Sequence, residues 1–159
     1  MIICQHHLVN GGLFIRSPID NATNYLMRAS DYEKINEFEK ASGDYTKVIF
    51  LNPEGSDGYY ARGILNRKNK NYTGAIRNFG KAINLDPKHE AAYFYRAEVF
   101  VTLKKYQEAL SDFDVTIELN PKFAHNYFGR GAVHHILGPD GHLIIPRLWP
   151  GQNPPATAC

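Results

Sequence analysis

Histidine and cysteine are the residue types here that could hold a metal ion or act in catalysis, so their spacing is the first test for chemistry. Two histidine pairs, at 6–7 and 134–135, are adjacent in sequence. Neighbouring side chains on a helix diverge and do not chelate one ion. His125, His134 and His142 have no cysteine or carboxylate partner at ligand spacing. The sequence therefore predicts no metal site, no cofactor and no catalytic residue, and we do not expect an enzyme.

Charge and composition exclude further classes of partner. The 159 residues carry 18 Lys and Arg against 16 Asp and Glu, and the basic residues are spread thinly. A nucleic-acid surface needs a clustered basic face, so no nucleic-acid partner is expected. A membrane span needs about 20 apolar residues in succession, and no such run occurs. With only Cys4 and Cys159, and no secretory leader recognised, we expect a cytoplasmic location.

A period of 34 residues organises the chain. A five-residue motif recurs at 25–29, 59–63, 93–97 and 127–131. It consists of tyrosine, a bulky apolar residue, a variable or aromatic residue, arginine, and then Ala or Gly. The tripeptides LNP, LDP and LNP recur with the same spacing at 51–53, 85–87 and 119–121. Many positions between these motifs also agree in register, which indicates a repeat protein.

Each period has the pattern of two helices. In the third period, Tyr93, Ala97 and Phe100 fall on one helical face, and an amphipathic pattern restarts at Tyr106. Proline closes the second helix, and the Asn or Asp before it is expected in the left-handed conformation found at helix ends. The expected units are an irregular leader (1–21), three repeats (22–55, 56–89, 90–123), the first helix of a fourth (124–137) and a Pro/Gly-rich irregular tail (138–159).

The fourth unit is incomplete, because five prolines and three glycines between 138 and 159 prevent a second helix there. Its first helix would leave Tyr127, Gly131 and Leu137 uncovered. Either the segment 143–149 folds back over that face, or the chain is a truncated or alternatively ended form of a longer array.

These units resemble the tetratricopeptide repeat, a 34-residue helix–turn–helix family, over about 22 to 137. The family's pattern is, in order, an aromatic residue, a small residue, an aromatic residue, an alanine, an aromatic residue, a small residue and a proline. In the third unit these positions are Tyr93, Ala97, Phe100, Ala109, Phe113, Thr116 and Pro121. Asn66 and Val48 depart from that pattern in the other units. The resemblance implies an all-α, right-handed solenoid of antiparallel helix hairpins, about three and a half units long, with irregular tails.

Three columns of the repeat carry structural expectations. The small residues are expected to face the central alanines of the second helices. They are Ala29, Gly63, Ala97 and Gly131. The first tyrosine of each copy is expected in the core, so truncating Tyr93 should cost more stability than truncating Phe94. The arginines are expected to pack the aliphatic part of their side chains against the protein and to keep their guanidinium groups in water. They are Arg28, Arg62, Arg96 and Arg130.

The residue after each first tyrosine points about 100° away around the helix, so it faces a different neighbour. In the family, that position lines the concave groove formed by the first helices. The implied groove residues are Leu26, Tyr60, Ile64, Arg67, Lys68, Phe94, Glu98, Val101, Phe128, Ala132 and His135. This surface is mostly apolar, with a basic edge at Arg67 and Lys68.

The resemblance implies a non-catalytic interaction module, or scaffold, that binds a peptide or helix of a partner protein in this groove. Family members that bind chaperone tails clamp the terminal carboxylates with Lys, Asn and Arg. The matching positions here are Leu26, Ser30, Ala61, Ala91 and Tyr95, or one unit later Tyr60, Ile64, Tyr95, His125 and Gly129. No carboxylate clamp is therefore expected. The alternative function is structural self-assembly through the uncapped C-terminal repeat end, with weak self-association.

Overall fold

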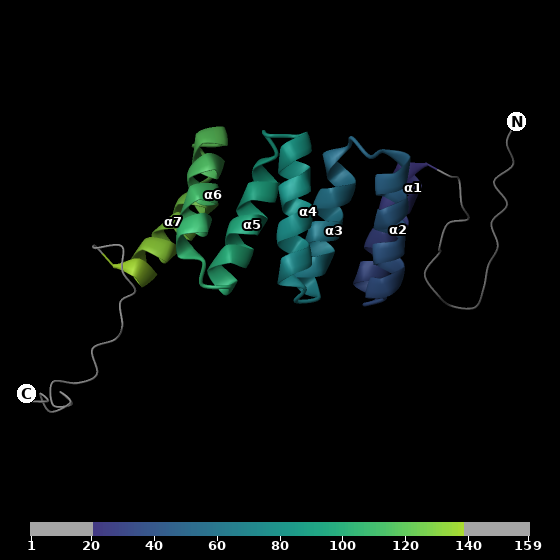
Figure 1. Cartoon of the computed structure of the whole chain (residues 1–159), viewed down its shortest axis with the longest axis horizontal. Helices are drawn as coiled ribbons and strands as arrows, with labels where there is room; N and C mark the ends of the chain where they lie inside the picture. Colours follow the sequence, from purple (N-terminus) through teal and green to yellow (C-terminus); the bar gives the residue numbers. More distant parts are fainter. Residues whose placement is uncertain (1–20, 139–159) are drawn as a thin grey trace, which may run out of the picture.

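The computed structural model describes residues 21–138. These residues form seven α-helices and no strand. In chain order they are α1 (Ala22–Lys34), α2 (Phe38–Leu51), α3 (Ser56–Lys68), α4 (Tyr72–Leu85), α5 (Glu90–Thr102), α6 (Tyr106–Leu119) and α7 (Ala124–Leu137). The helices pair as hairpins that stack along the long axis of the molecule (Figure 1). The predicted all-α solenoid is confirmed.

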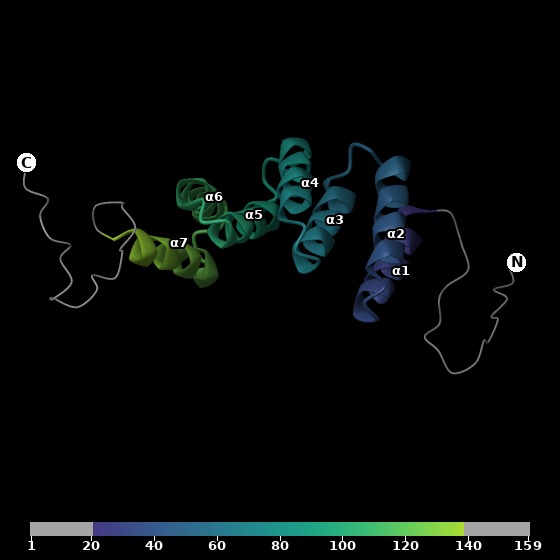
Figure 2. The same ribbon diagram turned by 60° about the horizontal axis from the view of Figure 1, so that its bottom comes forward.

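The stack has two layers of helices (Figure 2). The second helices of the hairpins, α2, α4 and α6, form one layer, and α1, α3, α5 and α7 form the other. Each second helix contacts the first helix of its own hairpin and that of the next hairpin. Within residues 21–138, α7 packs on α5 and α6 and has no second helix of its own.

Left-handed backbone occurs in the turn inside each hairpin and not before the prolines. Asn36, Lys70 and Lys104, again 34 residues apart, have φ of 59°, 58° and 60°. The prediction for the residue before proline was wrong, since Asn52 has φ −140° and ψ 78°, with Asp86 and Asn120 similarly extended. The reason is steric, because a following proline disfavours helical backbone and favours extended backbone.

The small column is buried where a second helix covers it. Ala29 and Ala97 are completely buried, and Gly63 is buried against the Phe79 ring, whereas Gly131 on α7 is exposed. The first tyrosines differ from expectation, because those of the first three hairpins are half-buried and Tyr127 is 42% exposed. The fully buried aromatic residues are Phe79 and Phe113, which come from the second helices.

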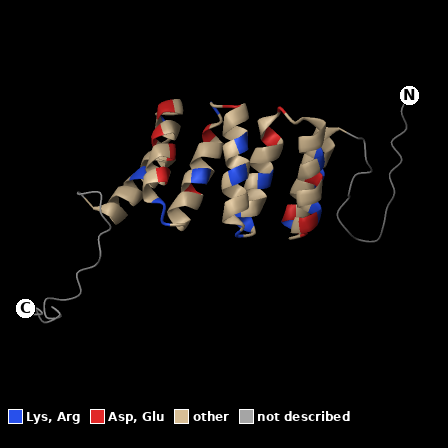
Figure 3. Cartoon of the chain, viewed as in Figure 1, with Lys and Arg blue, Asp and Glu red and all other residues tan. Residues whose placement is uncertain are grey.

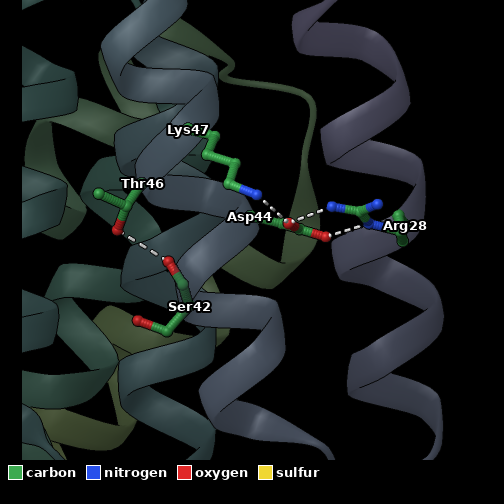
Figure 4. Close-up of polar contacts among 5 residues, drawn as sticks. All are labelled: Arg28, Ser42, Asp44, Thr46 and Lys47. Atoms are coloured by element: carbon green, nitrogen blue, oxygen red, sulfur yellow. Dashed lines mark hydrogen bonds and ion pairs between the residues drawn. The ribbon is translucent and has the colours of Figure 1, made fainter. Parts of the chain in front are cut away.

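Two arginines of the column, Arg28 and Arg96, tie the two helices of their hairpins together, so the expectation of solvated head groups was wrong for them. Arg28 donates from Nε and Nη2 to both carboxylate oxygens of Asp44 at 2.6 and 2.7 Å (Figure 4). Arg96 binds Asp112 in the same way, with both distances 2.7 Å. The hydrogen bond to Asp44 raises the pKa of the Arg28 guanidinium. These bidentate ion pairs each join residues 16 apart in sequence.

Two glycines of the small column give opposite expectations for the same substitution. A Cβ at Gly63 would lie 2.6 Å from the Phe79 ring, so Gly63→Ala should lower the free energy of unfolding by about 1–3 kcal/mol. A Cβ at Gly131 meets no atom within 4 Å, so Gly131→Ala should raise it by about 1 kcal/mol through helix propensity. Urea unfolding followed by circular dichroism measures both. A gain in both variants would contradict the close packing of α3 on α4.

Candidate functional site

The first helices α3, α5 and α7 line a groove composed of two adjoining hollows. The hollow on the α7 side has a volume of about 550 Å³ and is lined by Arg67, Lys68, Tyr72, Phe94, Glu98, Val101, Thr102, Phe113, His125, Phe128, Gly129, Ala132 and Val133. The hollow on the α3 side has a volume of about 560 Å³ and is lined by Tyr60, Arg67, Glu90, Ala91, Phe94, Tyr95, Glu98, Asn120, Phe123 and His125. Phe94 and His125 belong to both, so the two hollows form one surface.

The aromatic column of the groove is covered at its start and becomes exposed toward α7. The Tyr60 ring centroid lies 4.7 Å from that of His89 and 6.2 Å from that of Phe79. Burial raises the pKa of the Tyr60 hydroxyl. Phe94 is half-buried and packs edge-on against Phe113 at 5.8 Å. Phe128 is 73% exposed. The degree of exposure therefore follows from whether another repeat comes next.

This packing changes the expected difference in stability cost between truncating Tyr93 and truncating Phe94. Tyr93 and Phe94 are both half-buried. Tyr93 packs against the cluster of the second hairpin, and Phe94 packs against that of the third. Truncating Phe94 should therefore also cost stability, because its ring helps to join successive repeats.

The basic edge expected at Arg67 and Lys68 is neutralised by carboxylates of the same chain. Arg67 donates from Nη1 to Glu98 Oε2 at 2.8 Å, linking α3 to α5, and its guanidinium carbon lies 4.7 Å from the Tyr95 ring centroid. Lys68 forms an ion pair with Glu33 of α1. The Nε of Arg67 is buried and has no acceptor among the described residues. The groove thus presents apolar and aromatic surface with little free charge.

The structure places the predicted groove residues in two sets. Eight of them line the hollows, and these are Tyr60, Arg67, Lys68, Phe94, Glu98, Val101, Phe128 and Ala132. Three do not. Leu26 packs against the core of the first hairpin, Ile64 against that of the second, and His135 is exposed on α7 away from both hollows.

Sequence reasoning missed His125 and Tyr95 as lining residues. His125 is exposed beside three phenylalanine rings, with centroid distances of 5.3 Å to Phe94, 6.0 Å to Phe123 and 6.3 Å to Phe128. A signal was present, since both residues occupy positions that correspond to a carboxylate clamp in the resembled family. Neither residue was expected to bind a partner, because neither side chain can serve as that clamp's Lys, Arg or Asn.

Two other features do not occur in the same part of the chain, a metal-binding cluster and a membrane-crossing helix. Between residues 21 and 138, no group of three or more His, Cys, Asp or Glu residues is placed to hold a metal ion. None of the helices described reaches the length and hydrophobicity that a membrane crossing requires. His6, His7 and His142 lie outside the described residues.

Comparison with known proteins identifies the repeat. Residues 56–89, which include α3 and α4, match the family model of the tetratricopeptide repeat. The second hairpin is therefore a tetratricopeptide repeat, and its fold continues through the hairpins on either side. The recognition of tetratricopeptide repeats in this chain is confirmed. No curated protein matches the sequence.

Solved tetratricopeptide structures share the fold at low sequence identity. The crystal structure of MamA superposes with a TM-score of 0.68 at 22% identity, covering 73% of this chain and 68% of MamA. The first such domain of Spaghetti (RPAP3), bound to an HSP90 peptide, has a TM-score of 0.68 at 20% identity, covering 74% and 97%. The TPR2B domain of yeast Sti1, in complex with pHsp70, has a TM-score of 0.67 at 22% identity, covering 72% and 96%.

Proposed function

We propose that this chain is a non-catalytic interaction module whose groove binds an extended segment or a helix of a partner protein. The observation that carries the proposal is Phe128, which is 73% exposed at the edge of a hollow of about 550 Å³. An exposed aromatic ring beside a concave apolar surface is typical of a protein-binding site. Similar folds in RPAP3 and Sti1 hold chaperone peptides, which supports peptide binding as the use of this groove.

The chemistry of the groove favours an occupant with large apolar side chains. Phe94, Val101 and Phe128 provide the contact surface, whereas Arg67 and Lys68 are already paired with carboxylates. An acidic chaperone tail is not the occupant that we propose, because the clamp positions hold no Lys or Arg.

The proposal is tested by selecting binding peptides from a displayed random library and measuring their affinity for single variants. Phe128→Ala should weaken binding at least about tenfold, because exposed aromatic anchors dominate such interfaces. Its helical content should not change, since Phe128 contributes little to the core. Adding Phe94→Ala to this variant would be less informative, because Phe94 also supports Phe113. Raising the salt concentration should weaken binding less than removing the ring.

Phe50→Ala is the matched control. Phe50 on α2 is 83% exposed and lies outside the groove, so its removal should leave the affinity unchanged. If Phe128→Ala and Phe50→Ala bind every selected peptide as the wild type does, the groove is not the binding site.

Self-assembly is the second candidate, and it is favoured by the face of α7 that no other described helix covers. Tyr127 is 42% exposed, and Gly131 has no neighbour within 4 Å of an added Cβ. A second copy could cover this face in the way that a further helix covers it within a longer array. Mass measured as a function of concentration tests the idea. A strict monomer at high concentration, also after removal of residues 138–159, would exclude it.

The proposal includes no catalytic step. Tetratricopeptide proteins are in general interaction modules, and the proposed mechanism requires only complementary surfaces. We place the encounter with the partner in the cytosol, on the ground that the chain has two cysteines in 159 residues.

A further inference from the structure

Within residues 21–138, one arginine of the column has no carboxylate partner. Arg28 and Arg96 are neutralised by Asp44 and Asp112 of their own hairpins. At the corresponding position of the second hairpin stands Asn78, and Arg62 donates from Nε and Nη2 to its Oδ1 at 3.2 and 2.9 Å. The amide accepts these hydrogen bonds but carries no negative charge. Arg62 therefore keeps its full positive charge while half-buried.

Two further cations lie beside Arg62. The Arg62 guanidinium carbon and the Lys81 Nζ are each 5.9 Å from the ring centroid of Tyr59. Arg77 precedes Asn78 on α4, and Lys81 follows Arg77 by one helical turn. Burial lowers the pKa of Arg62, and the positive charge of Arg77 lowers it further, whereas Tyr59 raises it. The three cations thus share one region of the α3–α4 hairpin.

No carboxylate of the described residues neutralises this region. In the described part of the chain, Arg62, Arg77 and Lys81 form no ion pair, and α4 contains no Asp or Glu. Asp44, on the neighbouring α2, already accepts from Arg28 and lies 3.9 Å from Lys47. Figure 3 shows Lys and Arg without acidic residues along α4.

The rest of the second-helix layer limits which anion could bind. On α6, which lies in the same layer, there are four acidic and no basic residues, namely Glu108, Asp112, Asp114 and Glu118 (Figure 3). Asp112 and Asp114 are paired with Arg96 and Arg130, but α6 offers no basic side chain of its own, so a nucleic acid or an acidic membrane surface extending over the layer would gain no favourable contact on this helix. The three cations also line neither hollow of the groove, so a free ion would make few contacts. A short acidic peptide segment can contact all three cations and avoid α6.

We propose that Arg62, Arg77 and Lys81 form a docking site for a short acidic segment of a protein partner, on the α2–α4 side of the molecule and separate from the groove. Arg62 is the anchor, because its half-buried side chain is held in place by Asn78 and by Thr46 Oγ1 at 3.3 Å. Arg77 and Lys81 contribute exposed charge around it. The site is independent of any segment that binds in the groove.

The test measures the anisotropy of a fluorescein-labelled oligoglutamate peptide with the full chain at low salt. Asn78→Asp should weaken binding about tenfold, because the new carboxylate occupies Arg62 as Asp44 and Asp112 occupy their arginines. The same variant should be at least as stable as the wild type, which shows that the loss is not unfolding. Arg77→Gln combined with Lys81→Gln should also weaken binding, and added salt should weaken it in the wild type.

Gln107→Glu is the control for net charge, since it adds one negative charge at an exposed position of α6, in the same layer but outside the α3–α4 hairpin. It should change the affinity by less than about twofold. Equal weakening by Asn78→Asp and Gln107→Glu would overturn the site, because only net charge would then matter. The site would also be overturned if the wild type failed to bind the peptide, or if it bound duplex DNA, phosphatidylserine vesicles or inorganic phosphate in place of the peptide. The groove variant Phe128→Ala should leave peptide binding intact, which separates this proposal from the groove.

Discussion

Replacing Phe113 by alanine is expected to lower the free energy of unfolding by about 3–5 kcal/mol. The ring is 1% exposed and lies where three helices meet. It projects from α6, packs edge-on against Phe94 of α5, and would lie 2.6 Å from a Cβ at Gly129 of α7. Truncation removes a large apolar side chain and leaves a cavity that the close backbone of α7 cannot readily fill. Urea unfolding followed by circular dichroism measures the loss.

Phe50→Ala is the control for this prediction, because Phe50 is 83% exposed and should change stability by less than about 0.5 kcal/mol. Amide hydrogen exchange adds spatial detail. Repeat arrays are stabilised by contacts between neighbours, so exchange should accelerate in α5, α6 and α7 more than in α1 and α2. Similar stability losses for the two phenylalanines would mean that Phe113 does not have the packing described.

Asp112→Ala is expected to cost about 3–5 kcal/mol, since it leaves the Arg96 guanidinium without its counterion. The Asp112 side chain is 6% exposed and that of Arg96 is 21% exposed, so water can replace the lost carboxylate only in part. The bidentate pair also joins α5 to α6, and its loss should loosen the third hairpin. Thermal and urea unfolding both report the change.

Two milder variants calibrate this result. Asp112→Asn should cost less than Asp112→Ala, because an amide holds Arg62 at the equivalent position of the second hairpin. Asp114→Ala removes the partner of Arg130, but Asp114 is 54% exposed, so the cost should be below about 1 kcal/mol. If Asp112→Ala costs no more than Asp114→Ala, burial does not determine the strength of these pairs.

The sequence by itself determined the architecture of the array. The 34-residue period, the small residues at 29, 63 and 97, and the prolines at 53, 87 and 121 predict repeated helix hairpins without any coordinates. This works because helix formation and hairpin packing depend on local patterns that every repeat restates. The one backbone error, at Asn52 and its equivalents, came from giving helix-end preference more weight than the steric effect of the following proline.

The tertiary structure decided which side chains of the groove are free. Tyr60, Phe94 and Phe128 are equivalent in the repeat, yet the first two pack against neighbouring hairpins and Phe128 is left exposed. Arg67 pairs with Glu98, 31 residues away, and Lys68 pairs with Glu33, 35 residues away. These two pairs neutralise an edge of the groove that is basic in the sequence. Exposure and charge pairing depend on contacts between repeats, and a pattern within one repeat does not specify those contacts. The contact of Arg62 with Asn78 lies within one hairpin, but the sequence does not show that the arginine reaches the residue 16 positions further on, so the missing counterion of Arg62 is recognised only in the structure.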